Sequence, residues 1–172
     1  WKGIYFGYWH AISAFCNAGF DLFGHYQSLT AYVGDPVVNL SICLCIILGG
    51  LGFAVMRDVL KKRNFRQLKL HSKLVLTSTA ALIVVGTVVI TFLEGHNPGT
   101  MGSLSGSDAF WASFMQSVSP RTAGFNTIDL NSLRIPTMIF IILLMFIGAS
   151  PASTGGGIKT TTFVLILLNI SQ

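Results

Sequence analysis

Two short segments of this chain carry backbone carbonyl groups that could bind a dehydrated cation. Each segment joins a polar residue and an alanine to a glycine and an aromatic residue, and glycine lets the backbone turn its carbonyl groups toward one point. Bare carbonyl oxygens placed in this way can replace the water shell of an ion. The two predicted coordinating turns are Asn17, Ala18, Gly19 and Phe20, and Thr122, Ala123, Gly124 and Phe125.

The surroundings of these turns form an internal repeat. Gly19 and Gly124 lie 105 positions apart, and each follows a short apolar segment and precedes a loop, a proline and a long apolar run. About 20 apolar residues are needed to cross a bilayer as a helix, so the short segments are typical of re-entrant helices. Residues 122–126 also match the residue classes of the potassium-channel filter TVGYG. The repeated order predicts two helix–pore-loop–helix units.

The composition is that of a membrane protein. Apolar residues make up 52% of the chain, charged residues 10%, and the mean hydropathy is +0.67, whereas soluble domains carry about 25% charged residues. Seven of the eleven basic residues lie within 57–73, and five of the six acids lie near the opposite ends of the apolar runs. Because Lys and Arg gather in cytoplasmic loops, we expect the loop 58–72 to be cytoplasmic and both turns to open outward. This placement favours a topological role for the positive charge over nucleic-acid binding.

We therefore expect an all-α membrane protein built from repeated helix–pore-loop–helix units. Residues 1–57 would form the pore helix, the turn and the second transmembrane helix of one repeat, and the basic loop 58–72 would connect it to a complete repeat at 73–170. The second repeat is predicted to contain a transmembrane helix at 73–94, a pore helix at 108–118, a turn at 121–127 and a broken transmembrane helix at 136–169. Because the chain begins inside a unit, we expect a fragment of a larger pore.

Glycine-rich segments interrupt both long runs that follow a turn. In the first run, residues 49–53 contain three glycines, which allow either close helix packing or a lining of the inner pathway. In the second run, non-helical backbone at membrane depth is tolerated only where protein buries it or where it lines a watery cavity. We expect a gating loop there, with a static packing break as the alternative. The interruption covers residues 148–159 and includes Ala149, Ser150, Pro151, Ala152, Ser153, Thr154, Gly155, Gly156, Gly157 and Lys159.

Arg121 adjoins the second turn, where a positive charge on the axis would repel a cation. We expect its side chain to face away from the axis and to pair with an acid or with backbone carbonyls. Residues 157–160 are similar to the end of a phosphate-binding P-loop, but that motif needs Gly directly before Lys, and Ile158 intervenes here. We therefore expect no organic cofactor on this chain.

Four segments together resemble the Trk/Ktr/HKT family of potassium transporters, over essentially the whole chain. They are residues 17–20, 49–53, 119–127 and 153–160. The resemblance implies four helix–pore-loop–helix repeats around one pore, of which this chain would hold the end of the second and nearly all of the third. It also implies that Gly19 and Gly124 are filter glycines, that the carbonyls of 17–20 and 122–125 face K⁺, and that 149–157 form an intramembrane gating loop.

The same resemblance implies further expectations for the complete protein. K⁺ would be the transported ion, with Na⁺ also possible, in the plasma membrane of a bacterium. A homodimer would lie in the lipid bilayer, above a cytosolic ring of nucleotide-binding regulatory subunits, with no nucleic-acid partner. Without a complete TVGYG in every repeat there are fewer carbonyl rings, so we expect weaker discrimination against Na⁺ than in a potassium channel.

Three other functions are alternatives at this point. A membrane-embedded enzyme would need polar catalytic groups that converge within the bilayer, and the long apolar spans supply none; we therefore expect no enzymatic activity. A non-conducting assembly subunit would explain the glycines as packing residues, but not the repeated order of short helix, turn and long helix. A sodium/potassium-permeable transporter of the same family is the third alternative.

Overall fold

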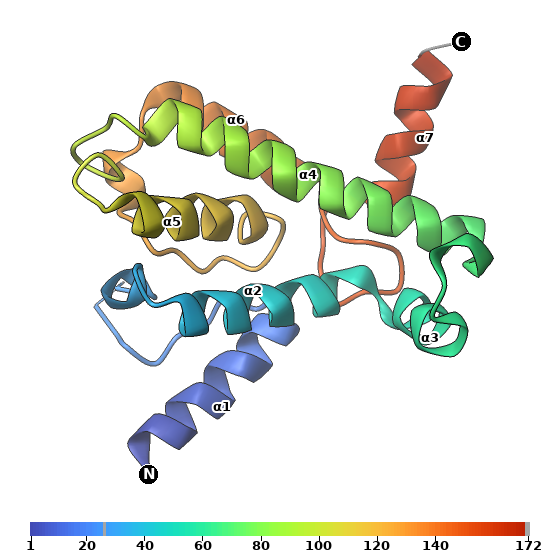
Figure 1. Cartoon of the computed structure of the whole chain (residues 1–172), viewed down its shortest axis with the longest axis horizontal. Helices are drawn as coiled ribbons and strands as arrows, with labels where there is room; N and C mark the ends of the chain where they lie inside the picture. Colours follow the sequence, from blue (N-terminus) through green and yellow to red (C-terminus); the bar gives the residue numbers. More distant parts are fainter. Residues whose placement is uncertain (26, 171–172) are drawn as a thin grey trace.

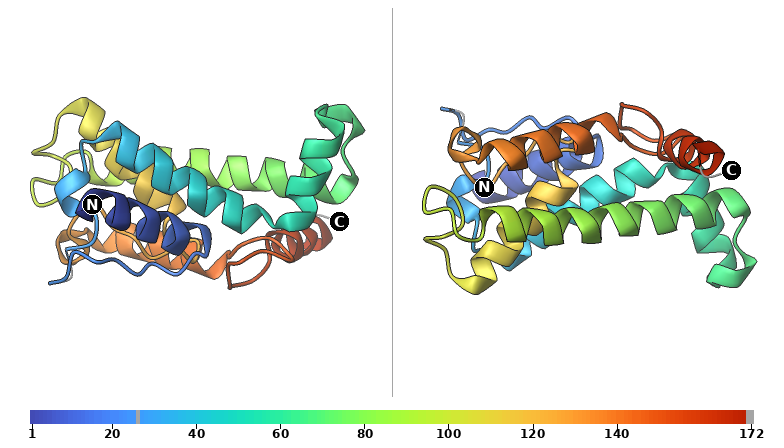
Figure 2. Two further views of the ribbon diagram at one scale, coloured as in Figure 1. Left: turned by 90° about the horizontal axis from the view of Figure 1, so that it is seen from below. Right: turned by 90° about the horizontal axis from the view of Figure 1, so that it is seen from above.

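The computed structural model describes residues 1–25 and 27–170, and the regular secondary structure in them is helical. Figure 1 shows α5 between α4 and α2, with α1 on the far side of α2, and Figure 2 shows the same arrangement from two other sides. The α-helices are α1 (Lys2–Phe15), α2 (Pro36–Leu51), α3 (Phe53–Lys62), α4 (Leu70–Glu94), α5 (Gly106–Val118), α6 (Ile135–Phe146) and α7 (Thr160–Ile170). The short 3₁₀ helices are η1 (Thr30–Tyr32), η2 (Phe65–Gln67) and η3 (Leu130–Ser132).

Helix α4 is the long element of the second unit. Its 25 residues and mean hydropathy of 2.3 make it, within the described part of the chain, the one unbroken helix long and apolar enough to cross a membrane. At 1.5 Å per residue it is about 37 Å long, somewhat more than a bilayer core of about 30 Å. Helix α5 has 13 residues. It runs back along α4 and ends near the middle of that helix (Figure 1).

A small-residue contact joins α4 to α5. A Cβ atom at Gly86 would overlap the Ser117 hydroxyl, so the two backbones approach closely only because that position is glycine. Ser117 Oγ then donates a hydrogen bond to the carbonyl oxygen of Ile83 at 2.8 Å. Small residues and interhelical hydrogen bonds of this kind are what hold helices together in lipid, where no hydrophobic force acts between them.

Helix α2 begins at a strong cap and ends at a sharp corner. Asp35 Oδ1 accepts hydrogen bonds from the backbone N–H groups of Val37 and Val38, and proline occupies the first helical position. The helix stops at Leu51, and the chain turns by 99° at Gly52 into α3. The glycines at 49–53 therefore coincide with a sharp bend within the run that continues to residue 57. The segment that follows α6 packs into this corner. The Phe53 N–H donates a hydrogen bond to the Ala152 carbonyl oxygen there, at 3.3 Å.

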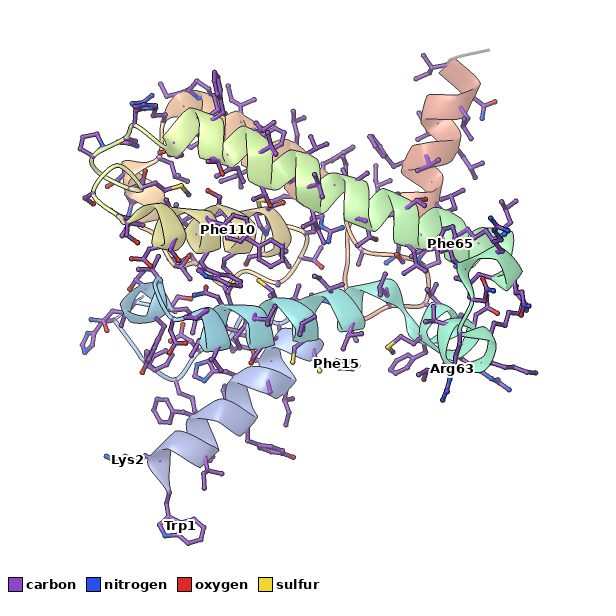
Figure 3. The ribbon with its side chains drawn as sticks, viewed as in Figure 1. Trp1, Lys2, Phe15, Arg63, Phe65 and Phe110 are labelled. Carbon is purple, nitrogen blue, oxygen red and sulfur yellow. The ribbon has the colours of Figure 1, made fainter. Side chains whose placement is uncertain are left out.

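The basic segment 58–72 contains more helix than a loop would, since α3 continues to Lys62 and α4 begins at Leu70. Asp58 ties its two ends together, because its Oδ2 accepts hydrogen bonds from the Lys69 N–H at 2.9 Å and from the Ser72 hydroxyl at 2.7 Å. These bonds, the backbone one first, hold the pKa of Asp58 below its ordinary value. Figure 3 shows Arg63 and Phe65 projecting from this end of the molecule.

Large apolar side chains lie on the outer surface of the molecule as well as in its core. Large apolar side chains are exposed on the outer faces of α1, α4 and α6, while Glu94, Gln116 and Thr137 are buried. Figure 3 shows Trp1 at the free tip of α1, away from the other helices. Extended apolar surface of this kind serves contact with lipid or with other protein, and buried polar groups mark functional or structural centres in membrane proteins.

Candidate functional site

The fold brings the two predicted turns into direct contact. One follows the C-terminal end of α1 and the other the C-terminal end of α5. A Cβ atom at Gly19 would overlap the carbonyl oxygen of Ala123 and lie 3.2 Å from Gly124 Cα. A Cβ atom at Gly124 would in turn lie 3.8 Å from Gly19 Cα. Two segments 105 positions apart in sequence are therefore backbone neighbours.

Both turns have the same unusual backbone conformation at equivalent positions. Asn17 and Gly19 have φ angles of 51° and 70°, and Thr122 and Gly124 have φ angles of 83° and 90°. A left-handed conformation costs an L-residue about 1–2 kcal/mol, and it is a genuine outlier for β-branched threonine. Strain of this kind persists where the surrounding structure imposes it, and it clusters at functional sites. The internal repeat thus extends from residue type to backbone geometry.

The carbonyl groups of the turns divide into two kinds. In the described residues, no hydrogen bond reaches the carbonyl oxygens of residues 17–19 or of residues 122–124. The next carbonyl in each turn does have a partner: Ser13 Oγ donates to Phe20 O at 2.8 Å, and Ser119 Oγ donates to Phe125 O. Of these residues, Asn17 and Ala123 are buried, whereas Ala18 and Gly124 are exposed. Carbonyl oxygens without a protein donor can coordinate a cation, so the two adjacent groups of oxygens are a candidate cation site.

The helix ends contribute to the electrostatics of this site. Ala18 N–H donates to Ser13 O, and the N–H groups of Ala123 and Gly124 donate to Ser119 O. The turns thus direct N–H groups toward the ends of α1 and α5. The C-terminal end of a helix carries about half a negative charge, which stabilises a cation placed beyond it. Both helix ends therefore favour a cation at the turns.

The non-helical segment 147–159, between α6 and α7, contacts both turns. Asn17 Nδ2 donates to Thr154 Oγ1 at 2.8 Å, and Thr154 Oγ1 donates to Phe15 O at 2.9 Å. On the second turn, a Cβ atom at Gly155 would overlap the Thr122 hydroxyl. Lys159 Nζ donates back to Gly155 O at 2.8 Å and so braces the segment from its far end.

The segment 147–159 packs against the glycine-rich C-terminal end of α2. Ser150 N–H donates to Gly50 O at 3.0 Å, and Thr154 N–H donates to Gly49 O at 3.3 Å. The last carbonyls of a helix lack partners within the helix, and here the segment supplies them. A Cβ atom at Gly49 would overlap Phe15 O. Of the two explanations for this glycine cluster, the geometry favours close packing.

Arg121 has a different environment from the one expected. The side chain is only 7% exposed, and within the described residues it has no ion pair or hydrogen bond; its Nε is buried without a partner. The acid or carbonyl partner predicted for it is therefore not found there. Its guanidinium lines a small cavity with Ser150 and Thr160, between the second turn and the segment 147–159.

Glu94 is a centre that the sequence analysis did not single out. Its carboxylate is fully buried at the end of α4 and accepts hydrogen bonds from four groups. These are the hydroxyls of Thr100 and Thr137, the Asn97 amide and the Arg134 backbone N–H. The bonds fix the beginning of α6 and the loop before α5 to the end of α4. The one signal in the sequence was an acid at the end of a long apolar run.

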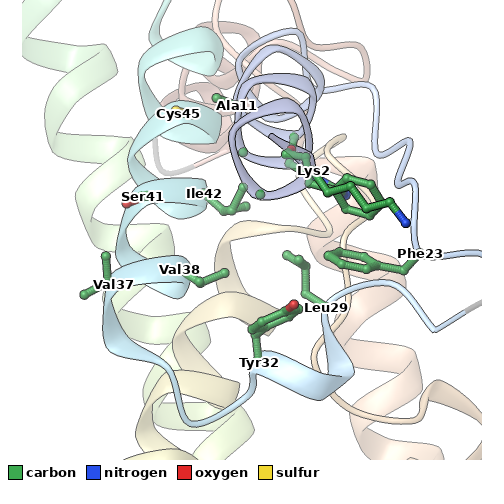
Figure 4. A pocket seen from close by; sticks show the side chains of 14 residues that line it. Lys2, Ala11, Phe23, Leu29, Tyr32, Val37, Val38, Ser41, Ile42 and Cys45 are labelled. Atoms are coloured by element: carbon green, nitrogen blue, oxygen red, sulfur yellow. The ribbon is translucent and has the colours of Figure 1, made fainter.

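A separate apolar groove lies between α1 and α2 and does not belong to the candidate site. It has a volume of about 550 Å³ and is lined by residues such as Phe23, Leu29 and Val38 (Figure 4). No residue of either turn lines it. Its walls offer apolar contact and no cluster of oxygen ligands.

Comparison with known proteins places this geometry in a family. Residues 2–172 match the family described as TrkH: Cation transport protein. The chain belongs to this family. It is 51% identical over 169 residues to Ktr system potassium uptake protein B of Bacillus subtilis, and 39% identical over 169 residues to potassium/sodium uptake protein NtpJ of Enterococcus hirae. Both alignments include 98% of this chain but 38% and 37% of the relatives, so the chain spans little more than a third of their length.

The TrkH family assignment confirms the resemblance found in the sequence. The fold is similar to that of the potassium transporter TrkH from Vibrio parahaemolyticus, with a TM-score of 0.73 at 21% identity, over 94% of this chain and 34% of that one. This likeness confirms the expected all-α fold of a partial chain. The family and these relatives are transporters and not enzymes, as the sequence analysis expected.

Proposed function

We propose that the protein containing this chain takes up K⁺ across the plasma membrane of a bacterium, and that the two turns belong to its selectivity filter. The observation that carries this function is the pair of facing turns with unpaired carbonyls at 17–19 and 122–124. The relatives support the choice of ion, since their names specify potassium uptake. The remaining walls of the pore come from the other parts of the protein.

The chemistry of uptake is an exchange of oxygen ligands. A K⁺ ion that enters from outside loses water and is coordinated by the carbonyls of the turns, while the ends of α1 and α5 add favourable electrostatic potential. The membrane potential drives the ion inward with about 2.3 kcal/mol per charge per 100 mV. Basic residues of the segment 58–72 remain on the cytoplasmic side.

Residues 149–157 act as the gate in this proposal. They lie against both turns through Thr154 and Gly155, on the side of α3, whose basic residues support a cytoplasmic position. In the described residues, two hydrogen bonds join them to α2, one joins them to α3, and two join Thr154 to Asn17 and Phe15. At about 0.5–1.5 kcal/mol each, these bonds hold the gate closed until a change elsewhere in the protein releases it and opens the path. A homodimer and a cytosolic ring of nucleotide-binding subunits are proposed from the family resemblance alone.

A second candidate is a transporter that carries both K⁺ and Na⁺. The specific support is the 39% identity to a protein named for potassium and sodium uptake. Three free carbonyls per turn also form fewer ligand rings than a complete TVGYG, and fewer rings discriminate less between the ions. Uptake of K⁺, Rb⁺ and Na⁺ measured side by side separates the two candidates.

The filter is tested with Gly124→Ser in the full-length protein, expressed in a bacterial strain that lacks potassium uptake. We expect the K⁺/Na⁺ uptake ratio to fall, because serine disfavours the φ of 90° at this position. Gly106→Ser is the matched control, since a Cβ atom there meets nothing within 4 Å. An unchanged ratio in Gly124→Ser with loss of assembly would assign the turn to packing and reject the filter.

The gate is tested by deletion of residues 152–156 from the full-length protein. We expect faster K⁺ flux that no longer responds to the regulatory subunits, because the contacts of Thr154 and Gly155 with the two turns are removed. Flux that stays slow and regulated would make the segment a static packing break and would place the gate elsewhere.

A further inference from the structure

A buried serine hydroxyl holds the aromatic carbonyl of each turn. Ser13 lies in the last turn of α1 and donates to Phe20 O at 2.8 Å; Ser119 lies just after α5 and donates to Phe125 O. Both serines are at most 6% exposed. Ser13 precedes Gly19 by six positions, and Ser119 precedes Gly124 by five. The two serines thus lie at different sequence distances from their glycines, and yet each hydroxyl bonds to the carbonyl of the residue after the glycine. A repeat of the sequence at a fixed spacing would not by itself produce this match.

We propose, on the basis of the function proposed above, that Ser13 and Ser119 are positioning residues that determine the ion selectivity of the filter. Each hydroxyl holds the fourth carbonyl of its turn against the pore helix and leaves three carbonyls free for the ion. Rotation of the Phe20 or Phe125 carbonyl toward the ion would strip a buried hydroxyl of its acceptor, which is unfavourable. The serines therefore fix both the number of ligands and the orientation of the peptide next to each glycine.

The strained backbone explains why this support matters. Thr122 and Gly124 hold left-handed conformations, and such conformations persist only where neighbouring contacts over-determine them. Ser119 contacts the second turn twice, since its carbonyl accepts from Ala123 and Gly124 while its hydroxyl donates to Phe125 O. Loss of the hydroxyl frees one end of the turn. A looser ring of carbonyls can contract around a smaller ion, so discrimination against Na⁺ falls.

The experiment compares K⁺/Na⁺ uptake ratios of full-length variants in the strain that lacks potassium uptake. We expect Ser119→Ala to lower the ratio by about 2- to 10-fold, the range that corresponds to one hydrogen bond. Ser113→Ala is the matched control on α5, because Ser113 is also fully buried but donates to Ala109 O and to Met101 Sδ, neither of which belongs to a turn. Its ratio should stay at the wild-type value.

At position 13, threonine and valine can be compared as side chains of the same shape with and without a hydroxyl. Ser13→Thr keeps the hydroxyl and Ser13→Val removes it, so we expect the ratio to be retained in the first variant and lowered in the second. Equal ratios in both, with only thermal stability reduced in Ser13→Val, would show that the serine merely satisfies a buried carbonyl. If Gly124→Ser also left the uptake ratio unchanged, the filter itself would be rejected. If Gly124→Ser lowered the ratio while Ser13→Val did not, only the proposed role of the serines would be rejected.

Discussion

The two turns share a backbone but not an environment. Phe125 is 1% exposed and lies in the core formed by α2 and α5, whereas the equivalent Phe20 is 69% exposed. The residue three positions before the glycine is buried Arg121 in the second turn and exposed Cys16 in the first. The outer loop of the first unit covers the second turn, because Asn126 N–H donates to Ser28 Oγ and Leu29 N–H donates to Asn126 O.

This difference distinguishes the residues that shape the backbone of each turn from the contacts that hold the turn in place. Both turns have positive φ angles at equivalent positions, so their backbone shape depends on a few local residues. The supports are specific to each turn: the first is bound to the segment 147–159 through Asn17, and the second is enclosed by protein on its outer side. Variants that affect one turn and spare the other test this division.

The largest expected effect comes from a direct comparison of Gly19 and Gly124, the glycines of the two turns. Gly19→Ala should abolish flux and lower the unfolding temperature strongly, because its Cβ atom would overlap the Ala123 carbonyl. Gly124→Ala has room, with its nearest neighbour 3.8 Å away, and carries only the cost of a left-handed alanine, about 1–2 kcal/mol. Thermal unfolding and K⁺ uptake of both full-length variants provide the measurement. Equal losses would mean that the two turns do not touch in the assembled protein.

Removal of the charge at Arg121 should stabilise the protein. The guanidinium is buried without an ion-pair partner in the described residues, and a buried charge without a partner carries a desolvation penalty of several kcal/mol that an apolar side chain of similar size avoids. We expect Arg121→Met to raise the unfolding temperature, with Cys16→Met at the equivalent exposed position as the control. A lower unfolding temperature for Arg121→Met would reveal a carboxylate partner supplied by another part of the protein.

If the segment 147–159 is the gate proposed above, loss of its bond to the first turn should raise basal flux. Thr154→Val keeps the side-chain shape but removes the bonds to Asn17 and Phe15, at about 0.5–1.5 kcal/mol each. We expect K⁺ flux without activating subunits to rise by up to about tenfold. Ser153→Ala is the control, since Ser153 bonds only to Ser150 O within the segment. A rise in both variants would point to general loosening of the segment.

The smallest effect should follow from loss of the outer support of the second turn. Ser28→Ala removes the acceptor of the Asn126 N–H, and we expect a destabilisation of about 1 kcal/mol. Faster amide hydrogen exchange at Asn126, with unchanged exchange in the first turn, is the specific measurement. Thr30→Val is the control, because its hydroxyl bonds to Gln27 O at an exposed position. Unaltered exchange at Asn126 would show that the outer loop does not support the turn.

Much of the local structure could be predicted from the sequence. Short apolar segments indicated α1 and α5, and small residues with glycine indicated the turns that follow them. The 99° corner at Gly52 could not be predicted. Three glycines at the end of a helix are compatible with a kink, a packing face or a stop. The choice is made by Ala152, a hundred positions further along the chain, whose carbonyl accepts the Phe53 N–H.

The sequence alone determined the membrane character, the repeat and the residue types of the two turns, because hydropathy, charge placement and glycine chemistry act over a few neighbouring positions. Only the tertiary structure decided that Gly19 meets Ala123, that Thr154 bonds to Asn17, and that Arg121 is buried without a partner. These contacts join segments far apart in the chain. They depend on how closely the helices approach one another at Gly86 and Gly49. A local sequence pattern does not specify the distance between two helices.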